Sequence, residues 1–358
     1  SGDLEFDSTI QKVNEAFGGY ESKEVTHPTF PEEQPITAPI EKEVFGPTSE
    51  SVYVAFRTDG VGSKDQKIVY LIDYILANSQ AGLIDLDLNQ KQKVQQASSY
   101  TNFDNDYGFH LLYGMPKADQ TLEEVKDLLL AEVEKIKKGE FDDWLIDAVI
   151  NDLKLSEIRQ YEDASSVAYA HMDAFIHFQD WQDVVDFTND LKSITKEELV
   201  NYANEHYKDN YVTVYKRIGE DPNIAKVENP GITPVQLNRD KQSDFLIEFN
   251  KSEAPVLTPQ YVDYEKAIKE SKTENGLPVS YILNENNDLF NLYFIFDMGQ
   301  DNDKEISLAT GYLDYLGTDK YTPEELKQEF YKLGISYFVS AGSDQIYVGI
   351  SGLKENLP

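Results

Sequence analysis

Five histidines are the side chains of this sequence best suited to bind a metal or to carry a proton: His27, His110, His171, His177 and His206. A metal site on a single helix needs two such ligands on the same face. His171 and His177 are six residues apart, or about 240° around a helix, so they do not share a face. We therefore expect these histidines to be core or surface residues and not ligands.

Three further motifs come close to a functional pattern without completing it. Asp85–Gln96 starts with oxygen-bearing side chains at alternate positions, but Gln90 and Gln96 replace the glycine and the glutamate of a calcium loop. Asn102–Asp106 alternates in the same way and is interpreted as a hairpin turn that bonds its own backbone. Asp59–Lys64 lacks phosphate-loop spacing and is interpreted as an ordinary strand-to-helix loop. The sequence thus predicts no catalytic, cofactor-binding or metal-binding residue.

The composition is that of a folded and strongly acidic protein. The chain has 358 residues, 40% of them hydrophobic and 12% aromatic, which is enough for two or three domains with their own cores. Its 65 acidic and 32 basic residues give a formal charge of −33. Such a charge repels phosphate backbones, so we predict no nucleic-acid partner. The same negative charge would attract a cationic peptide, or its sole effect is to keep the protein soluble.

The sequence also argues against thiol chemistry and a membrane span. There is no cysteine, which removes disulfides, thiolate metal sites and cysteine nucleophiles. No apolar run reaches the roughly 18 residues of a membrane-spanning helix. The acidic opening Ser1–Asp7 is not a signal peptide, and both ends of the sequence are expected to be cuts within a longer chain.

The stretch around which the other elements must be arranged is a strand followed by a helix. Phe109–Met115 is apolar and aromatic, and Pro116 ends it because proline has no N–H for a ladder. Thr121 and Glu124 have capping-box spacing, and Gly139 can end the helix that follows. The apolar stripe of this helix comprises Leu122, Val125, Leu128, Leu129, Val133 and Ile136. The unit needs a sheet to complete it.

The flanking segments supply that sheet. Strands are predicted at 51–57, 97–103 and 211–217, with an extended piece at 40–45. Helices are predicted at 6–17, 67–78, 142–159, 163–178, 181–191 and 194–207, and 83–96 is expected to be helical in part. The order β-α-β-β-α-α-α-α-β predicts an α+β fold, with helices on one face of a mostly antiparallel sheet.

A second block follows a connector. Residues 219–276 are rich in proline and hold only short apolar pieces, so we interpret them as an interdomain connector. Strands at 277–284 and 289–298, helices at 304–315 and 323–333, and strands at 336–340 and 345–351 are then predicted. This second block reads β-β-α-α-β-β.

Tyrosine is abundant, with 23 residues. Tyr161 and Tyr169 form one cluster along the chain, and Tyr207, Tyr211 and Tyr215 form another. Such side chains can line a peptide-binding chamber, or they pack at strand and helix interfaces with a polar tip in reach of a partner. We expect packing.

Taken in order, several segments resemble the pitrilysin/insulinase family of zinc metallopeptidases, the inverzincins, whose homologous α+β domains form two halves around a chamber. The matching segments are Ser1–Asp7, Leu71–Met115, Thr195–Val200, Tyr207–Val214, Ile232–Asp240, Asn275–Val279 and Leu316–Leu326. The resemblance implies the tail of the catalytic domain at 1–20, a linker at 21–48, a second α+β domain at 49–219, a connector at 220–275 and a partial third domain at 276–358.

The family's catalytic motif is missing from this chain. The resemblance calls for His-x-x-Glu-His, with the histidines binding zinc and the glutamate acting as base. The aligned positions are Leu308, Gly311 and Tyr312, which can do neither. Family members also hold substrate with an arginine and a tyrosine, and the equivalent loop Asn89–Gln96 offers neither. The third domain therefore resembles the non-catalytic half, and zinc ligands are expected upstream of Ser1.

The resemblance implies two functions. The first is the non-catalytic portion of a bacterial zinc metallopeptidase that encloses and cleaves peptides, with this piece inactive by itself and holding peptides by strand addition at a sheet edge. The alternative is a catalytically silent scaffold or peptide-binding subunit of the same fold. The expected partner is a peptide, a cationic one if the charge contributes. A periplasmic or otherwise exported location is expected by resemblance alone.

Overall fold

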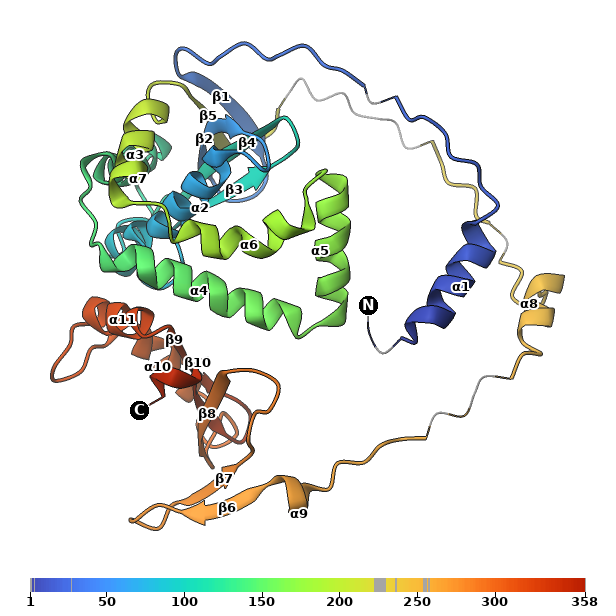
Figure 1. Cartoon of the computed structure of the whole chain (residues 1–358). Helices are drawn as coiled ribbons and strands as arrows, with labels where there is room; N and C mark the ends of the chain where they lie inside the picture. Colours follow the sequence, from blue (N-terminus) through green and yellow to red (C-terminus); the bar gives the residue numbers. More distant parts are fainter. Residues whose placement is uncertain are drawn as a thin grey trace. The chain divides into compact units, whose positions relative to one another are not determined.

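The structure is a computed structural model that describes residues 2, 4–26, 28–221, 230–235, 237–253, 256 and 258–357. It divides into two compact units (Figure 1). Ser1–Asp221 and Asn287–Pro358 form the first unit, and Pro222–Asn286 forms the second. The domain limits drawn from the sequence stay a prediction.

The first unit contains a five-stranded sheet whose order is β1-β5-β2-β4-β3. The strands are β1 (Ile40–Gly46), β2 (Ser51–Asp59), β3 (Gln96–Phe103), β4 (Tyr107–Met115) and β5 (Tyr211–Ile218). Every neighbouring pair is antiparallel except β1 and β5, which run parallel. The mostly antiparallel sheet predicted from the sequence is therefore confirmed, and the extended piece expected at 40–45 is the edge strand β1.

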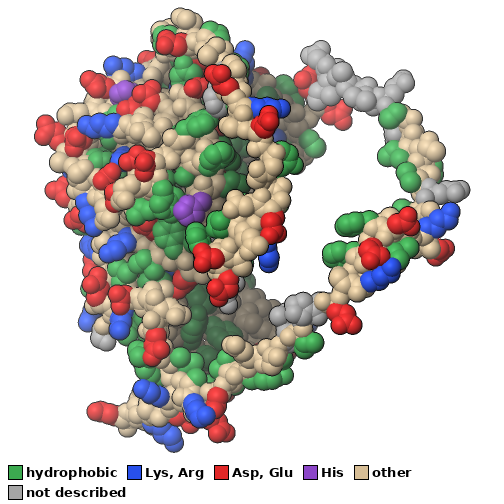
Figure 2. Space-filling view, turned by 45° about the vertical axis from the view of Figure 1, so that its right-hand side comes forward, with side chains coloured by type: hydrophobic (Ala, Val, Ile, Leu, Met, Phe, Trp, Pro, Cys, Tyr) green, Lys and Arg blue, Asp and Glu red, His purple; other side chains and the backbone are tan. Residues whose placement is uncertain are grey.

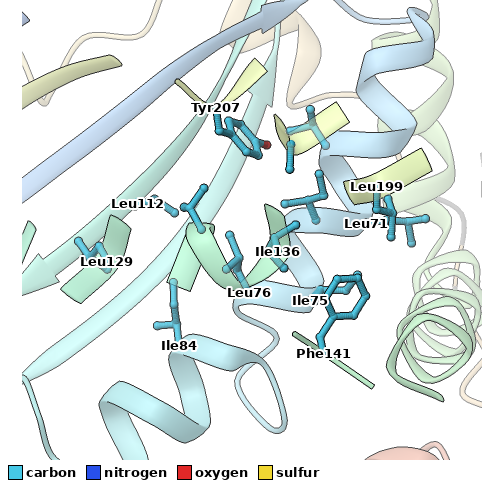
Figure 3. Close-up of a cluster of buried hydrophobic side chains, with 14 of the residues drawn as sticks. Leu71, Ile75, Leu76, Ile84, Leu112, Leu129, Ile136, Phe141, Leu199 and Tyr207 are labelled. Carbon is cyan, nitrogen blue, oxygen red and sulfur yellow. The ribbon is translucent and has the colours of Figure 1, made fainter. Parts of the chain in front are cut away.

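The helices of this unit pack on one face of the sheet. α2 (Lys64–Leu76) and α3 (Leu122–Lys138) contact the sheet directly. On them pack α4 (Trp144–Tyr161), α6 (Trp181–Leu191) and α7 (Lys196–His206), and α5 (Ala164–Ile176) packs on α4 and α6. Along β2 and β4 burial alternates, so that every second side chain faces the helices and the others are half-exposed. Side chains of α2, β4 and α3 gather in one apolar cluster (Figure 3). The α+β class with helices on one face is confirmed.

The central strand and helix form as their sequence predicts. Thr121 and Glu124 make a complete capping box, and Gly139 ends α3 in the left-handed conformation with φ 68°. Gly114 of β4 allows α3 to approach closely, because a Cβ there would lie 2.4 Å from Val125 Cγ1. The strand and helix are therefore packed against each other as one unit.

The second block of the first unit holds a three-stranded sheet of order β8-β10-β9. Its strands are β8 (Leu289–Phe296), β9 (Ile335–Ala341) and β10 (Ile346–Leu353), with α10 (Ile306–Tyr312), the short η2 (Leu313–Tyr315) and α11 (Pro323–Lys332) between β8 and β9. Tyr331 of α11 is buried within the main core cluster. The strands and helices predicted for 289–351 are confirmed within a few residues, and a short 3-10 helix, η3 (Lys354–Asn356), follows β10.

The second unit is small and largely exposed. It contains α8 (Asp244–Phe249), α9 (Tyr264–Ala267) and a hairpin of β6 (Lys269–Lys272) with β7 (Pro278–Tyr281). The sequence analysis predicted β7 but not β6. Near the start of the chain, α1 (Phe6–Phe17) is present as predicted and has no buried residue among those described.

Candidate functional site

The outer edge of β3 is one of the two edges of the five-stranded sheet, and β1 forms the other. β3 lies at the end of the sheet and pairs with β4 alone. At the hairpin, Asp104 N donates to Tyr107 O at 3.0 Å. Antiparallel pairing alternates, so the even-numbered residues of β3 bond to β4 and the odd-numbered ones point their N–H and C=O outward. The outward residues are Ala97, Ser99, Thr101 and Phe103.

These four outward residues differ in what they bind. Ala97 N donates to Asn89 Oδ1, and Ala97 O accepts from Asn89 Nδ2, both at 2.8 Å. Within the described part of the chain, the peptide groups of Ser99, Thr101 and Phe103 have no hydrogen-bond partner on that side. An extended peptide could supply those partners by adding a strand.

A polar cavity of about 350 Å³ lies next to the start of this edge. Asn89, Gln90, Gln96 and Lys327 are among its lining residues. Lys327 Nζ donates to Gln90 Oε1 at 2.7 Å, which links α11 to the short π-helix η1 (Asp85–Gln90). The polar lining of this cavity could bind polar groups of a peptide that extends past the start of β3.

The sheet face opposite the helices carries half-exposed aromatic side chains. Tyr53 and Tyr113 lie with ring centroids 5.1 Å apart, and Tyr100 contacts Phe109 at 6.1 Å. Tyr100, on β3 itself, is 47% exposed. Of these rings, that of Tyr100 on β3 is placed to contact side chains of a strand added at the outer edge.

His110 is the one histidine in the core among those described, and it lies within a buried polar cluster. Its Nδ1 is 2.8 Å from the Tyr207 hydroxyl, and its Nε2 is 3.2 Å from Asp73 Oδ1, in ion-pair range but not aligned as a hydrogen bond. Burial raises the pKa of Tyr207 well above its ordinary value. All three side chains are sealed from solvent, so the cluster serves the core and not a substrate.

The other described histidines also have structural contacts. His171 stacks on Trp181 with ring centroids 3.7 Å apart, His206 stacks on Tyr202, and His177 Nδ1 lies 2.9 Å from Asp173 O. No cluster of potential metal ligands exists in the described ranges. His27 lies outside the described residues.

The near-motifs of the sequence have ordinary roles. Asp85 Oδ2 accepts from Asn78 N and Gly82 N, and burial raises the pKa of Asp85. Asp87 pairs with Lys91 and Lys135, which hold the pKa of its carboxyl below the usual value against the effect of burial. These carboxylates are thus already engaged and do not form a calcium loop.

The two remaining motifs form the predicted turn and loop, although the bond within the turn joins two side chains instead of a side chain and the backbone. Asn102–Asp106 turns β3 into β4, with Asn102 Nδ2 donating to Asp104 Oδ2 at 3.2 Å. Asp59–Lys64 joins β2 to α2, and Ser63 accepts from Gln66 N as the helix cap. Leu308, Gly311 and Tyr312, aligned with the family's catalytic positions, lie on α10.

The prediction that the tyrosines pack holds for one cluster and not for the other. Tyr207 and Tyr215 are buried and Tyr211 is half-buried. Tyr169 is 62% exposed, and Tyr161 is exposed as well. The prediction was wrong for these two. Tyr161 is the last residue of α4. Tyr169 lies on α5, which buries only Ala174, so most side chains of that helix have no second layer against them.

The sequence does not single out Asn89, which lies in a segment that fails the spacing of a calcium loop and carries neither arginine nor tyrosine. The one available indication was an amide in a short polar segment directly before an edge strand, because such side chains can bond backbone groups.

Comparison with known proteins gives a consistent assignment. Residues 1–153 match the family described as Peptidase M16 inactive domain. The zinc protease PqqE of Helicobacter pylori is 25% identical over 178 residues, covering 49% of this chain and 39% of that protein. The crystal structure of a protease from Helicobacter pylori has a TM-score of 0.55 at 22% identity, covering 60% of this chain and 53% of that one. The chain thus spans well under two thirds of each of these two proteins.

The predicted resemblance to pitrilysin-type zinc metallopeptidases without the catalytic domain is confirmed by these matches. The match is to the family's inactive domain and covers residues 1–153, so the assignment of the block from 276 to 358 to the non-catalytic half stays a prediction. Among the described residues, no helix is both long and apolar enough to span a bilayer. Acidic and basic side chains are interspersed on the face shown in Figure 2.

Proposed function

We propose that this chain, whose residues 1–153 match the M16 inactive domain, is the non-catalytic portion of a zinc-dependent metallopeptidase that encloses and cleaves peptides. The zinc and its ligands would belong to the full-length protein, upstream of Ser1. This piece would contribute a wall that binds the substrate. The periplasmic or exported location stays a prediction.

The observation that carries the proposal is the free outer edge of β3. Three successive outward residues, Ser99, Thr101 and Phe103, offer three N–H and three C=O groups to an extended chain. Main-chain hydrogen bonds of this kind bind peptides of many sequences, which suits a peptidase of broad substrate range. The formal charge of −33 favours cationic peptides through long-range attraction.

The alternative is a silent subunit of the same fold, which would bind peptides by the same edge without a catalytic partner. The two functions differ in the zinc of the complete natural protein. One zinc per chain, with peptide cleavage that a chelator abolishes, supports the peptidase. A zinc-free complete protein that cleaves nothing supports the scaffold. Chelator-sensitive cleavage by the 358-residue chain itself would contradict the proposal that this portion is non-catalytic.

The β3 edge is tested by Thr101→Pro. Proline removes an outward N–H, which an edge strand tolerates, and its ring blocks a strand from adding there. Binding of a capped hexapeptide of alternating lysine and valine should weaken by at least about tenfold, or 1.4 kcal/mol, measured by calorimetry. Thr101→Val keeps the N–H and is the matched control, expected to bind as the unchanged protein does. Equal binding by all three proteins would place the peptide elsewhere.

A further inference from the structure

We infer that Asn89 sets the register in which an extended peptide pairs with β3. The added strand pairs with Ser99, Thr101 and Phe103 and stops at Ala97, where the Asn89 amide occupies the place of a neighbouring strand. This inference rests on the proposed peptide-binding function and adds to it the residue that sets the register.

The contact of Asn89 reproduces that of a strand neighbour. A residue in a ladder exchanges one N–H and one C=O bond with its partner. Asn89 makes the same two bonds to Ala97 through its side chain, at 2.8 Å each. A peptide extending past Ser99 would have to break both and leave the half-buried amide without partners, which costs free energy.

The backbone around Asn89 is held at both ends. Leu86 and Leu88 of η1 are buried, and Asp85 accepts two backbone N–H groups at its start. After η1, Lys93 N donates to Leu88 O at 2.8 Å and Gln92 N donates to Asn89 O at 3.0 Å. The amide is therefore preorganised. π-Helical turns such as η1 are rare and are often found at functional sites.

The opposite end of the edge lies at the hairpin. β3 ends at Phe103, and Asp104 N donates to Tyr107 O at 3.0 Å as the chain turns into β4. The open window thus runs from Ser99 to Phe103, about 16 Å of strand at the usual rise per residue. A peptide leaving the window at the Asn89 end meets the polar cavity lined by Gln90 and Lys327.

Amide hydrogen exchange, resolved by residue, tests the register on the 358-residue chain. Without peptide, the Ala97 amide should exchange slowly, and those of Ser99, Thr101 and Phe103 quickly. The capped lysine–valine hexapeptide should slow these three by at least about tenfold. In Asn89→Ala, the Ala97 amide should exchange quickly without peptide and become slow with it, because the window has grown by one outward residue.

Two controls separate a change of register from general unfolding. The Tyr100 amide bonds to β4 and should stay slow in every protein. Asn204→Ala removes an asparagine that also bonds two backbone groups, Lys137 O and Val200 O, at a site on α7, and should leave all β3 amides unchanged.

The outcomes test strand addition at β3 separately from the register set by Asn89. If the peptide slows exchange at Ser99, Thr101 and Phe103 but leaves the Ala97 amide fast in Asn89→Ala, Asn89 does not set the register, and strand addition at β3 still holds. Fast exchange of Ala97 in the unchanged protein overturns the role of Asn89 in the same way. If the peptide slows none of the outward amides in either protein, strand addition at β3 is wrong, and the register fails with it.

Discussion

The two sheets of the first unit have similarly apolar strands and very different burial. Val52, Val54 and Leu112 of the five-stranded sheet are fully buried. β8 of the three-stranded sheet reads LFNLYFIF, yet each residue from Leu292 to Phe296 is between 39% and 55% exposed. An apolar, β-branched and aromatic sequence is therefore enough to predict a strand, but not to predict that the strand is buried.

The second layer accounts for the difference. α2 and α3 cover one face of the five-stranded sheet, and a glycine at position 114 lets α3 approach it closely. β8 is an edge strand whose side chains are exposed on both faces from Leu292 to Phe296, whereas α10 and α11 contact β9. Burial, and with it most of the hydrophobic stabilisation, comes from the layer that covers a strand.

The largest expected loss of stability comes from truncating a core side chain. Leu112→Ala should cost about 2–5 kcal/mol of unfolding free energy, because it leaves a cavity in a closed core. Ile295→Ala in β8 should cost less than about 1 kcal/mol, since that side chain is already 55% exposed. Urea unfolding followed by circular dichroism measures both. Equal losses would mean that β8 is covered as fully as β4 and would remove the contrast between the sheets.

A smaller effect is expected where the two sheets' helices meet, at Asp152 of α4 beside α11. Burial raises the pKa of Asp152, while Arg159 opposes the shift. Because the pKa of the Asp152 carboxyl is higher in the folded than in the unfolded state, its bound proton contributes to stability. That contribution is complete below the unfolded pKa of about 3.9 and is lost as the pH rises through the folded pKa. The unchanged protein should therefore lose stability relative to Asp152→Asn as the pH rises above about 4.

Urea midpoints from about pH 4 upward measure the difference. Asp147→Asn, on the exposed side of the same helix, controls for the loss of one charge. A difference between Asp152→Asn and the unchanged protein that is independent of pH would show that Asp152 is not buried against α11.

Helices and strands whose starts, ends and buried faces are all marked by local sequence signals could be predicted from the sequence. The strand and helix from Phe109 to Gly139 carry a proline stop, a capping box, an apolar stripe and a glycine end, and the structure reproduces each of them. By contrast, β6 consists of Lys-Glu-Ser-Lys and forms only because β7 pairs with it. No periodicity within those four residues announces a strand.

Binding of a peptide at a sheet edge stays a prediction, and the sequence does not say which strands form the edges, because that depends on strand order. β1 closes one side of β5 by pairing with residues some 170 positions away, as Ile40 does with Val212. The role of Asn89 likewise depends on where η1 meets Ala97, and a single-residue pattern does not encode that contact.

The parallel pairing of β1 with β5 also sets how this sheet bears load. The chain enters the sheet at Ile40 and leaves it at Ile218, at opposite ends of one parallel pair. Tension along the chain would therefore pull the two strands past each other lengthwise, loading seven residue pairs together instead of peeling them apart one at a time. Arg217 reinforces this pair by bonding Glu43 of β1 at 2.7 Å. The sheet therefore resists tension applied at Ile40 and Ile218, where the chain enters and leaves it.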